Sequence, residues 1–587
     1  MKKTILFALL GMLAGSPVAK AQNPMVLHAL NDELARSMGQ LRLESQSPPY
    51  YAAYQVSDAY FLHLTASSGA LTRNDEERSR TLKVDLRVGN YSLDNSHFQS
   101  MDFWGGMSPF SFRSEAAMPL DDDYDVLRRT IWLQTDEAYK GALETLSRKK
   151  AYLQNTIRTD SLPDFTKGEK FTHLPAGTPW KVQRNELARL VEQASQAFLK
   201  ESKIHKSEID LETFLEDDYF VNSEGVESAQ PHQGSKLVIT ASTQADDGMP
   251  LKNFQVYVFT DPSGLPDRQK LAADIAALVS DLMALRAAPV VEDYSGPVLF
   301  EQQAAAEILA QGFVPRLLAK RKAESDNAQF NTFSTKNANP LLSKVNTRVL
   351  PRFVSLKATP AVRTYKGVPL LGSYEVDDEG VRAREVSLVE DGFLKGFLLT
   401  RSPVKGFGQS NGHFRGGSTA PSVVRFLTTQ GKSPQDLKKI LIDRLKEDGL
   451  KYGYLVRSIL PPAQVDRDGN DFQSMFMERY SAGSDGVKLT NPVRVYRVYP
   501  DGKEELVRGA EFENINIRSF KDLLGTGKDE FIYNYPVTPA PDMSFGRSNS
   551  NGLYATIIAP SFILADVDIK KATGNYRQPP IVSHPAP

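Results

Sequence analysis

The chain has 587 residues, too many for one hydrophobic core, and the usual size of domains favours about two to four. Lysine and arginine number 70 against 71 for aspartate and glutamate, and neither sign dominates a long block, so the electrostatic signature of a nucleic-acid-binding protein is missing. The chain has no cysteine, which excludes a lipid-modified cysteine anchor, disulfides and a thiol nucleophile.

The first residues have the pattern of a secretory signal peptide. Met1-Lys2-Lys3 is basic, residues 5–13 are apolar, and Ala19-Lys20-Ala21 is a small-x-small cleavage site. A membrane anchor is the weaker alternative, because the apolar run is shorter than the ~20 residues that a helix needs to span a bilayer. We therefore predict that residues 1–21 are removed by cleavage after Ala21, and that the mature protein is secreted or periplasmic, with no transmembrane anchor.

The next part of the chain alternates long helical patterns with short strand patterns. Apolar residues at helical spacing predict helices at 25–43, 121–150, 182–200 and 267–286. Aromatic and β-branched runs predict antiparallel strands at 50–56, 60–67, 81–88, 209–215, 218–222, 236–242 and 253–260. Residues 160–180 are turn-rich and polar, which indicates a surface excursion or a linker.

These patterns predict an α+β fold in two domains. The N-terminal domain, residues 22–290, is an antiparallel sheet packed by long helices. The C-terminal domain, residues 291–572, is β-rich around a central helix. Residues 573–587 are predicted to be a disordered tail.

Three acidic runs could suggest a metal site. In residues 120–125 four carboxylates precede a helix, where the macrodipole and N-capping favour acids without a metal. Residues 466–470 resemble the start of a calcium loop, but the glycine and the glutamate that such a loop needs are absent. Asp377-Asp378-Glu379 is interpreted as a solvated turn.

The central helix of the second half lies in residues 295–318. Val298, Leu299 and Phe300 follow Gly296-Pro297 as a short buried strand. Apolar residues then recur at helical spacing from Ala304 to Phe313, so a strand leads directly into a helix.

This stretch resembles the start of the C-terminal domain in the TldD/PmbA family, once called modulators of DNA gyrase. Residues 372–401, 411–417 and 555–568 are similar to later parts of the same family. The resemblance implies dimers in which a TldD-type subunit hydrolyses peptides, with a zinc ion held by His-Glu-x-x-x-His on this helix and by a later cysteine. The TldE/PmbA-type subunit is understood to lack that motif. The neutral charge balance gives the gyrase label no support.

The chain departs from the TldD pattern at each ligand. Glu301 and Gln302 stand where that branch has its first histidine and its glutamate, and Ala306, which has no lone pair to donate, stands at the second histidine. The remaining cleft candidates are Asn411, His413 and Arg415, although a lone loop histidine is more often solvated than a ligand. We therefore assign no catalytic residue, no metal ligand and no cofactor.

The leading hypothesis is an exported, metal-free family member, a pseudoenzyme that binds peptide or protein substrates or acts as partner subunit of a zinc peptidase. The dimer would form with itself or with a zinc-bearing relative. The alternative is an active peptidase with a divergent zinc site, built from Glu301, His413 and a loop carboxylate. A cell-surface adhesin is a weaker third class, because the long helices do not suit an all-β binding module.

Overall fold

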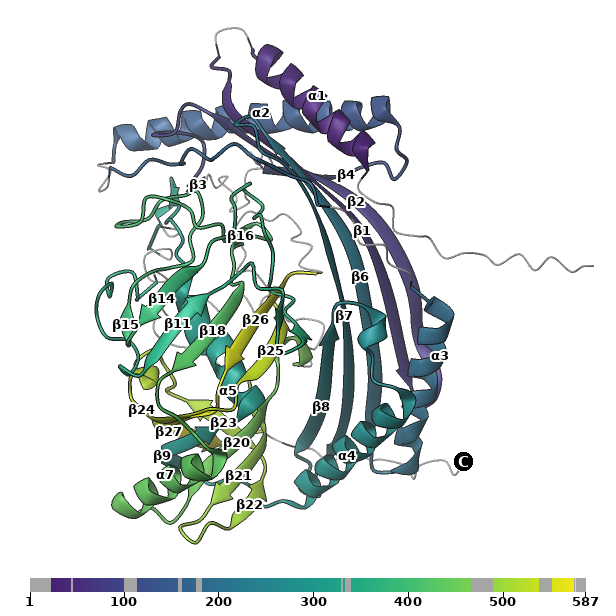
Figure 1. Ribbon diagram of the computed structural model, residues 1–587, viewed down its shortest axis with the longest axis vertical. Coiled ribbons are helices and arrows are strands. Elements are labelled where there is room, and N and C mark those ends of the chain that lie inside the picture. The colour runs from purple at the N-terminus through teal and green to yellow at the C-terminus, as the bar shows by residue number, and fades with distance from the viewer. Residues whose placement is uncertain are drawn as a thin grey trace, which may run out of the picture.

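The computed structural model of the chain describes residues 23–43, 46–99, 113–156, 161–175, 182–328, 331–332, 339–465, 489–537, 552–574 and 576 (Figure 1). The predicted signal peptide, the calcium-like run and most of the predicted tail lie outside these residues. Within the described part of the chain, no helix combines the length and the apolar character needed to cross a membrane.

The N-terminal half is built on one long, curved and mainly antiparallel sheet that bends around the C-terminal half (Figure 1). Its strand order is β4-β2-β1-β6-β7-β5, and β8 also pairs with β7. The bounds are β1 Pro49–Ser67, β2 Ala70–Val88, β4 Arg113–Ala117, β5 Thr172–His173, β6 Lys206–Asn222, β7 Glu227–Gln244 and β8 Pro250–Phe259.

Two of these strands are longer than the sequence pattern predicts. We predict breaks near residues 57–59 and 216–217, but β1 and β6 each run through without interruption. Those breaks rest on polar residues that interrupt the apolar pattern. The sheet accommodates them through pairing across strands, since Asp58 Oδ2 on β1 lies 2.5 Å from the Arg80 guanidinium on β2.

Four helices cover the sheet face that points away from the C-terminal half. They are α1 Pro24–Gln40, α2 Tyr124–Gln154, α3 Arg184–Ser195 and α4 Arg268–Ala287. α1 and α2 pack on one end of the sheet, and α3 and α4 on the other, in two separate apolar clusters. The capping interpretation of the first acidic run is confirmed, because Asp123 accepts the N–H groups of Asp125 and Val126 at 3.0 Å.

Alternation along the strands gives the sheet two different faces. On β2, Leu82, Val84 and Leu86 belong to the apolar cluster under α1 and α2. Lys83, Asp85 and Arg87 alternate with them and point to the opposite face, toward the C-terminal half. The face that meets the C-terminal half is therefore polar.

The C-terminal half consists of two sheets with α5 (Gln302–Ile308) between them (Figure 1). The six-stranded sheet has the order β15 (Phe393–Leu394), β14 (Val386–Glu390), β11 (Val354–Ala358), β18 (Val423–Thr428), β26 (Tyr554–Ala559), β25 (Phe531–Pro536). The eight-stranded sheet has the order β19 (Gly431–Lys432), β24 (Leu523–Gly527), β27 (Phe562–Lys571), β9 (Tyr294–Phe300), β20 (Gly453–Ile459), β21 (Pro492–Val498), β22 (Glu504–Val507), with β23 (Ala510–Glu513) on β27.

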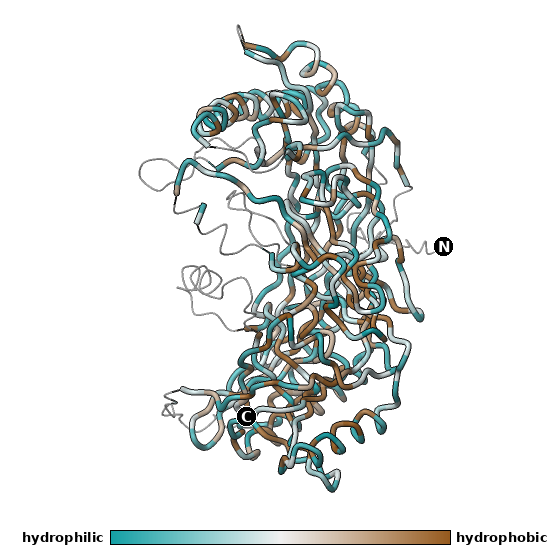
Figure 2. The backbone as a smooth tube through the Cα atoms, turned by 90° about the vertical axis from the view of Figure 1, so that its left-hand side faces the viewer, coloured by the Kyte–Doolittle hydropathy of each residue, from teal (hydrophilic) through white to brown (hydrophobic). Residues whose placement is uncertain are grey.

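One large apolar core joins both sheets to α5. Figure 2 shows apolar stretches of chain gathered inside the lower part of the molecule, with polar stretches outside. α7 (Pro434–Glu447) covers the outer face of the eight-stranded sheet. Ser433 followed by Pro434 predicts the start of a helix, and the Ser433 hydroxyl caps α7 by accepting the Asp436 N–H. The predicted α+β architecture, with a β-rich second half around a central helix, is confirmed.

Short elements complete the described chain. They are β3 (Phe98–Gln99), β10 (Glu324–Ser325), β12 (Thr364–Tyr365), β13 (Val368–Pro369), β16 (Phe414–Arg415), β17 (Ser418–Thr419), and the single turns η1 (Gln196–Lys200), η2 (Pro262–Gly264), η3 (Leu309–Phe313), η4 (Val314–Leu317), η5 (Pro462–Gln464) and η6 (Ser519–Lys521). β3 pairs with β10 in parallel, so a ladder connects the two halves.

The apolar runs at residues 397–401 and 555–569 each predict one strand, and both predictions are wrong. Residues 555–569 belong to two strands, β26 and β27, which lie in different sheets and are separated by Pro560 and Ser561. Proline has no N–H to donate to a ladder, so it marks the corner between them. Residues 397–401 form no named strand; within them only Leu398 forms an isolated bridge, with Leu318.

Candidate functional site

The N-terminal end of α5 carries the residues that stand in the family's zinc positions. Glu301 precedes the helix, and its N–H donates to the Val456 carbonyl at 2.9 Å, so the end of β9 remains tied to β20. Its carboxylate forms an ion pair with Arg457, with Nε and Oε2 3.1 Å apart. Arg457 also pairs with Glu504 at 3.0 Å. The Glu301 carboxylate is thus neutralised by a cation rather than left as a ligand.

Gln302 has a left-handed backbone conformation, with φ 43°, which is uncommon for a residue other than glycine. Its N–H donates to the Ser561 hydroxyl at 3.1 Å, and that hydroxyl donates to Asp529 Oδ2 at 2.5 Å. Ser561 comes from the corner between β26 and β27. Two hydrogen-bonded side chains from the last part of the sequence, Ser561 and Asp529, therefore hold the start of α5 in place.

The rest of α5 faces the protein interior. Ala306 is fully buried, with no exposed surface, between two other buried residues, Ala305 and Glu307. The Glu307 carboxylate accepts a hydrogen bond from Gln311 Nε2 at 2.7 Å and another from the Tyr533 hydroxyl. Burial raises the pKa of Glu307 to about 7, against the opposing effect of those two hydrogen bonds.

These residues do not fit a zinc ion. A catalytic zinc site needs three side-chain donors and an open position. Here one position holds an alanine in the core, and another holds a carboxylate paired with arginine. Across the described residues, no group of three histidine, aspartate or glutamate side chains is arranged to hold a metal.

The middle of the loop at residues 411–417 is buried, contrary to the prediction for its histidine. His413 has no exposed surface. Its Nδ1 lies 2.9 Å from Asn411 Oδ1, and its Nε2 lies 3.1 Å from the Ser422 hydroxyl. Burial lowers the pKa of His413 to about 3, so the ring is neutral. The prediction of a solvated loop histidine is wrong because both ring nitrogens find partners within the loop and in Ser422.

Asn411 and Arg415 have fixed positions in the same loop. The Asn411 amide accepts the Leu399 N–H at 2.8 Å and donates to the Phe397 carbonyl at 2.8 Å. Arg415 Nη1 donates to the carbonyls of Pro421 and Tyr554, at 3.2 and 3.1 Å. Hydrogen bonds inside the C-terminal half therefore account for both side chains, which are framework groups rather than exposed cleft groups.

The acidic turn at residues 377–379 is also buried, and its interpretation as a solvated turn is wrong. Asp377 accepts the N–H groups of Phe414 and Val381, at 3.0 and 2.8 Å. Glu379 accepts the N–H of Arg401 at 2.7 Å. Burial, with Glu379 nearby, raises the pKa of Asp377 well above its usual range. The turn therefore organises the backbone of two neighbouring loops.

The five predicted cleft residues do not form one cluster. Glu301 and Gln302 lie at the start of α5, and Asn411, His413 and Arg415 lie in the loop beside the acidic turn. No hydrogen bond or ion pair between these two groups is found in the described part of the chain.

A second polar region lies where the acidic turn faces the N-terminal sheet. Asp218 on β6 accepts from the Ser57 hydroxyl, and its Oδ2 lies 3.6 Å from His232 Nε2. Burial and the neighbouring Asp218 raise the pKa of both Glu216 and Asp378. Crowded carboxylates of this kind hold protons more tightly than exposed ones.

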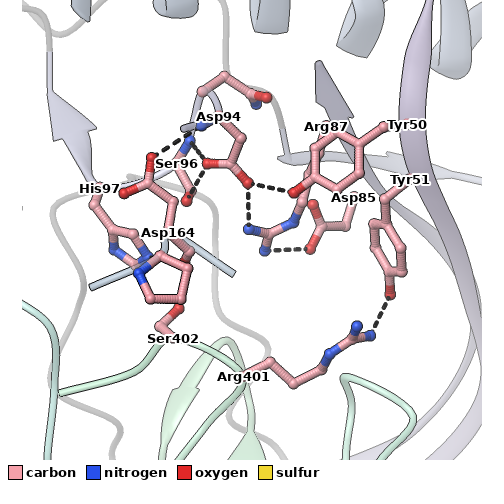
Figure 3. A network of polar contacts seen from close by, with 12 residues as sticks. Tyr50, Tyr51, Asp85, Arg87, Asp94, Ser96, His97, Asp164, Arg401 and Ser402 are labelled. Atoms are coloured by element: carbon pink, nitrogen blue, oxygen red, sulfur yellow. Dashed lines mark hydrogen bonds and ion pairs between the residues drawn. The ribbon is translucent and has the colours of Figure 1, made fainter. Parts of the chain in front are cut away.

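An extensive polar network joins the two halves (Figure 3). We call Arg87, Asp94, Lys149, Asp164 and Arg401, with the ring of Phe165, the junction cluster. Arg87 pairs with Asp94 at 3.2 Å, and Lys149 pairs with Asp164 at 2.7 Å. Burial by itself would raise the pKa of Asp94, but Arg87 and the hydrogen bonds from Ser96 lower it to about 2.

Arg401 is one residue of the C-terminal half in this cluster, and Arg321 of the same half also lies 3.7 Å from Asp164 Oδ1. The Arg401 guanidinium pairs with Glu224 Oε2 at 2.7 Å and donates to the Thr166 carbonyl at 2.5 Å. The Phe165 ring lies between two guanidinium groups, 3.6 Å from Arg87 and 3.9 Å from Arg401. Residues 164–166 are buried, so the prediction of a surface excursion at 160–180 is wrong for them. In the sequence, only the alternation on β2 could have indicated the junction cluster, because it points Arg87 toward the other half.

Comparisons with known proteins place this architecture. Residues 293–507 match a family model described as the PmbA/TldA metallopeptidase C-terminal domain. A stretch of 121 residues is 32% identical to a protein named "Metalloprotease" from Archaeoglobus fulgidus, and it covers 21% of this chain and only 26% of that relative.

Solved structures resemble almost the whole chain. TldE from Thermococcus kodakarensis is 13% identical, with a TM-score of 0.55, over 92% of this chain and 100% of the other. A putative modulator of DNA gyrase from Thermotoga maritima is 15% identical, with a TM-score of 0.55, over 88% of this chain and 96% of the other. At these identities, the likeness concerns the fold alone.

Fold and matched region together define a metallopeptidase-related protein of two α+β halves. Residues 293–507 are thus similar to the C-terminal domain of the TldD/PmbA family, and the fold of almost the whole chain is similar to that of TldE.

Proposed function

We propose that this protein is an exported, non-catalytic member of its family that binds peptide and serves as the partner subunit of a zinc peptidase. The observation that carries the proposal is the chemistry at α5. The positions that correspond to the two zinc histidines hold Glu301, which is paired with Arg457, and Ala306, which is packed in the core.

The loop at residues 411–417 and the acidic turn at residues 377–379 also support the proposal. His413 and Asp377 hold backbone and side-chain groups of their own half, and both are buried. A catalytic acid or base must reach a substrate proton directly or through one water molecule. These two groups are instead committed to the framework.

Zinc analysis of the purified mature protein tests the non-catalytic role. We expect far less than one zinc ion per chain after dialysis, with no change in Glu301→Gln or in the exposed control Glu390→Gln. About one tightly held zinc ion per chain, lost in Glu301→Gln or His413→Ala but kept in the control, would overturn the proposal.

Peptidase assays test the partner role. With fluorescent casein as substrate, the protein alone should show no hydrolysis, whereas a co-exported relative with an intact His-Glu-x-x-x-His motif should co-purify with it and hydrolyse casein in a chelator-sensitive way. Hydrolysis by the protein alone would contradict the proposal. A Glu307→Gln variant would then show whether that buried carboxylate is responsible.

Amino-terminal sequencing tests export. The protein recovered from the native envelope or medium should begin at Gln22. Recovery of a chain that still starts at Met1 from the cytoplasm would argue against this part of the proposal.

A further inference from the structure

The N-terminal sheet has two edges with different chemistry. β4 covers only Thr81–Asp85 of β2, which leaves the first half of β2 as one edge. That edge carries five charged residues between positions 73 and 78. Charged side chains are a common means of preventing a free edge from pairing with another strand. This edge is therefore protected in the usual way.

The other edge, β8, has no such protection. It pairs with β7 from Pro250 to Phe259, and none of the described residues forms a ladder with its outer side. Lys252 is its one charged residue, and its ammonium group donates to the Gln464 carbonyl at 2.7 Å. The end of the strand, from Phe254 to Phe259, is rich in aromatic and β-branched residues, which favour pairing.

A cavity lies beside the end of this edge. Its volume is about 380 Å³, and its walls include Tyr257, Val258 and Thr260 on one side. Gly367, Val368 and Pro369, at the tip of the β12–β13 hairpin, form the wall from the C-terminal half. Val368 is 38% exposed, so its side chain is accessible to a ligand in the cavity. Figure 1 shows β8 as the long strand of its sheet that lies nearest to the C-terminal half.

We propose that an extended peptide binds to the outer edge of β8 as an added strand, with an apolar side chain in the cavity between β8 and the β12–β13 tip. This inference rests on the proposed peptide-binding function and assigns it a place. Every second residue of an edge strand points its N–H and C=O away from the ladder, so the strand offers backbone hydrogen bonds to any sequence. The cavity would then select the side chain.

The surroundings favour a peptide over the β8 strand of a second copy. The hairpin tip of the C-terminal half stands across the cavity from the strand. A single extended segment fits between two such walls, whereas the edge of a second sheet would bring its neighbouring strands and helices against the hairpin. The occupant is therefore a lone strand.

Fluorescence anisotropy with the mature protein tests the backbone part of the proposal. The probes are labelled heptapeptides of alternating serine and valine, and the same peptides with every second amide N-methylated. We expect saturable binding of the first set and at least tenfold weaker binding of the methylated set, because methylation removes the edge donors. Equal binding of both sets, or no binding of either, would overturn the proposal.

A matched pair of variants tests the cavity. Val368→Lys places a charge in the wall and should weaken binding about tenfold or more. Leu199→Lys changes another exposed apolar residue, on η1, and should leave binding within about twofold. Both positions are on the surface, so neither change should unfold the protein. Unchanged binding in Val368→Lys would place the peptide elsewhere.

The absence of cysteine in the chain allows a direct localisation. A bromoacetyl heptapeptide should label Thr260→Cys, beside the cavity, and should fail to label Thr72→Cys on the β2 edge. Labelling of the β2 variant alone, or dimerisation that the peptide does not reverse, would count against the β8 site. The zinc and co-purification tests do not involve this edge, so failure of the proposed function can be told apart from failure of this inference.

Discussion

The junction cluster and the N-terminal end of α5 both contain several charged side chains, but those of the junction are buried and those at α5 are partly exposed. At the junction, Arg401 and Glu224 are only 1% and 6% exposed, and several hydrogen bonds satisfy them. At α5, Arg457 and Glu301 are 36% and 27% exposed and form an open ion pair. A buried charge that loses its partner is costly, while an exposed one is solvated by water.

This difference separates folding from function. The junction cluster holds the two halves together and tolerates little change. The outer part of α5 can exchange charged for neutral side chains with small loss of stability, so a family site there can lose its ligands without loss of the fold. Four predictions test this contrast.

The largest effect is expected for Arg401→Ala. Removal of the guanidinium leaves the Glu224 carboxylate buried without its cation and exposes one face of Phe165. We expect the free energy of unfolding to fall by about 3–5 kcal/mol, measured by urea denaturation at neutral pH. The control is Arg384→Ala, whose exposed pair with Glu169 also links the two halves. That variant should lose less than about 1 kcal/mol, and equal losses in the two variants would refute the contrast.

The next prediction concerns pH. The pKa of Glu307 is about 7 in the folded protein against an ordinary value of 4.5, so the folded state binds the proton more tightly. The stability that this group contributes is complete below pH 4.5 and is lost as the pH rises through 7. The difference of 2.5 units corresponds to about 3 kcal/mol as an upper bound. Urea titrations at pH 5 and pH 8 should therefore show a steeper loss in the wild type than in Glu307→Gln.

The junction should respond to acid in the opposite direction. The pKa of Asp94 is lowered to about 2, below its ordinary value, so its contribution is present at neutral pH and is lost as the pH falls through 2. The Asp94→Asn variant should have a lower free energy of unfolding than the wild type at neutral pH. This difference should disappear at low pH, where Asp94 of the wild type is protonated. If the loss of unfolding free energy changed with pH in the same direction in the Asp94 and Glu307 variants, the two clusters would not respond oppositely to pH.

The sequence predicted what depends on local pattern and failed where partners are distant. Neighbouring residues were enough to predict the long helices and the caps at Asp123 and Ser433. They also showed that residues 301, 302 and 306 lie at the start of a helix. The burial of Phe165 could not, because its neighbour Arg401 lies more than 200 positions away in the chain. Polar turns are ordinarily solvated, and only the tertiary contacts of the acidic turn reveal the exception.

The third prediction compares two positions of the family's motif. Ala306→His introduces a ring into a site with no exposed surface, and overpacking of this kind costs about 1–3 kcal/mol. Glu301→His, at a position that is 27% exposed, should cost less than about 1 kcal/mol. Thermal denaturation of both variants gives the comparison. Equal melting temperatures would mean that the core around α5 has room for a second histidine.

The smallest effect is expected for Glu301→Gln, which removes the charge but keeps the shape of the side chain. Because the pair with Arg457 is partly exposed and Arg457 retains Glu504, the loss of unfolding free energy should stay below about 1 kcal/mol. It should also shrink as salt is raised from low to molar concentration, since added ions screen an exposed pair. The control is the Arg401 variant in the same salt series, whose loss should change little because its charges are buried. A large, salt-independent loss in Glu301→Gln would indicate that Glu301 has a role in the framework of α5 beyond this ion pair, and the end of the helix would then belong with the junction cluster.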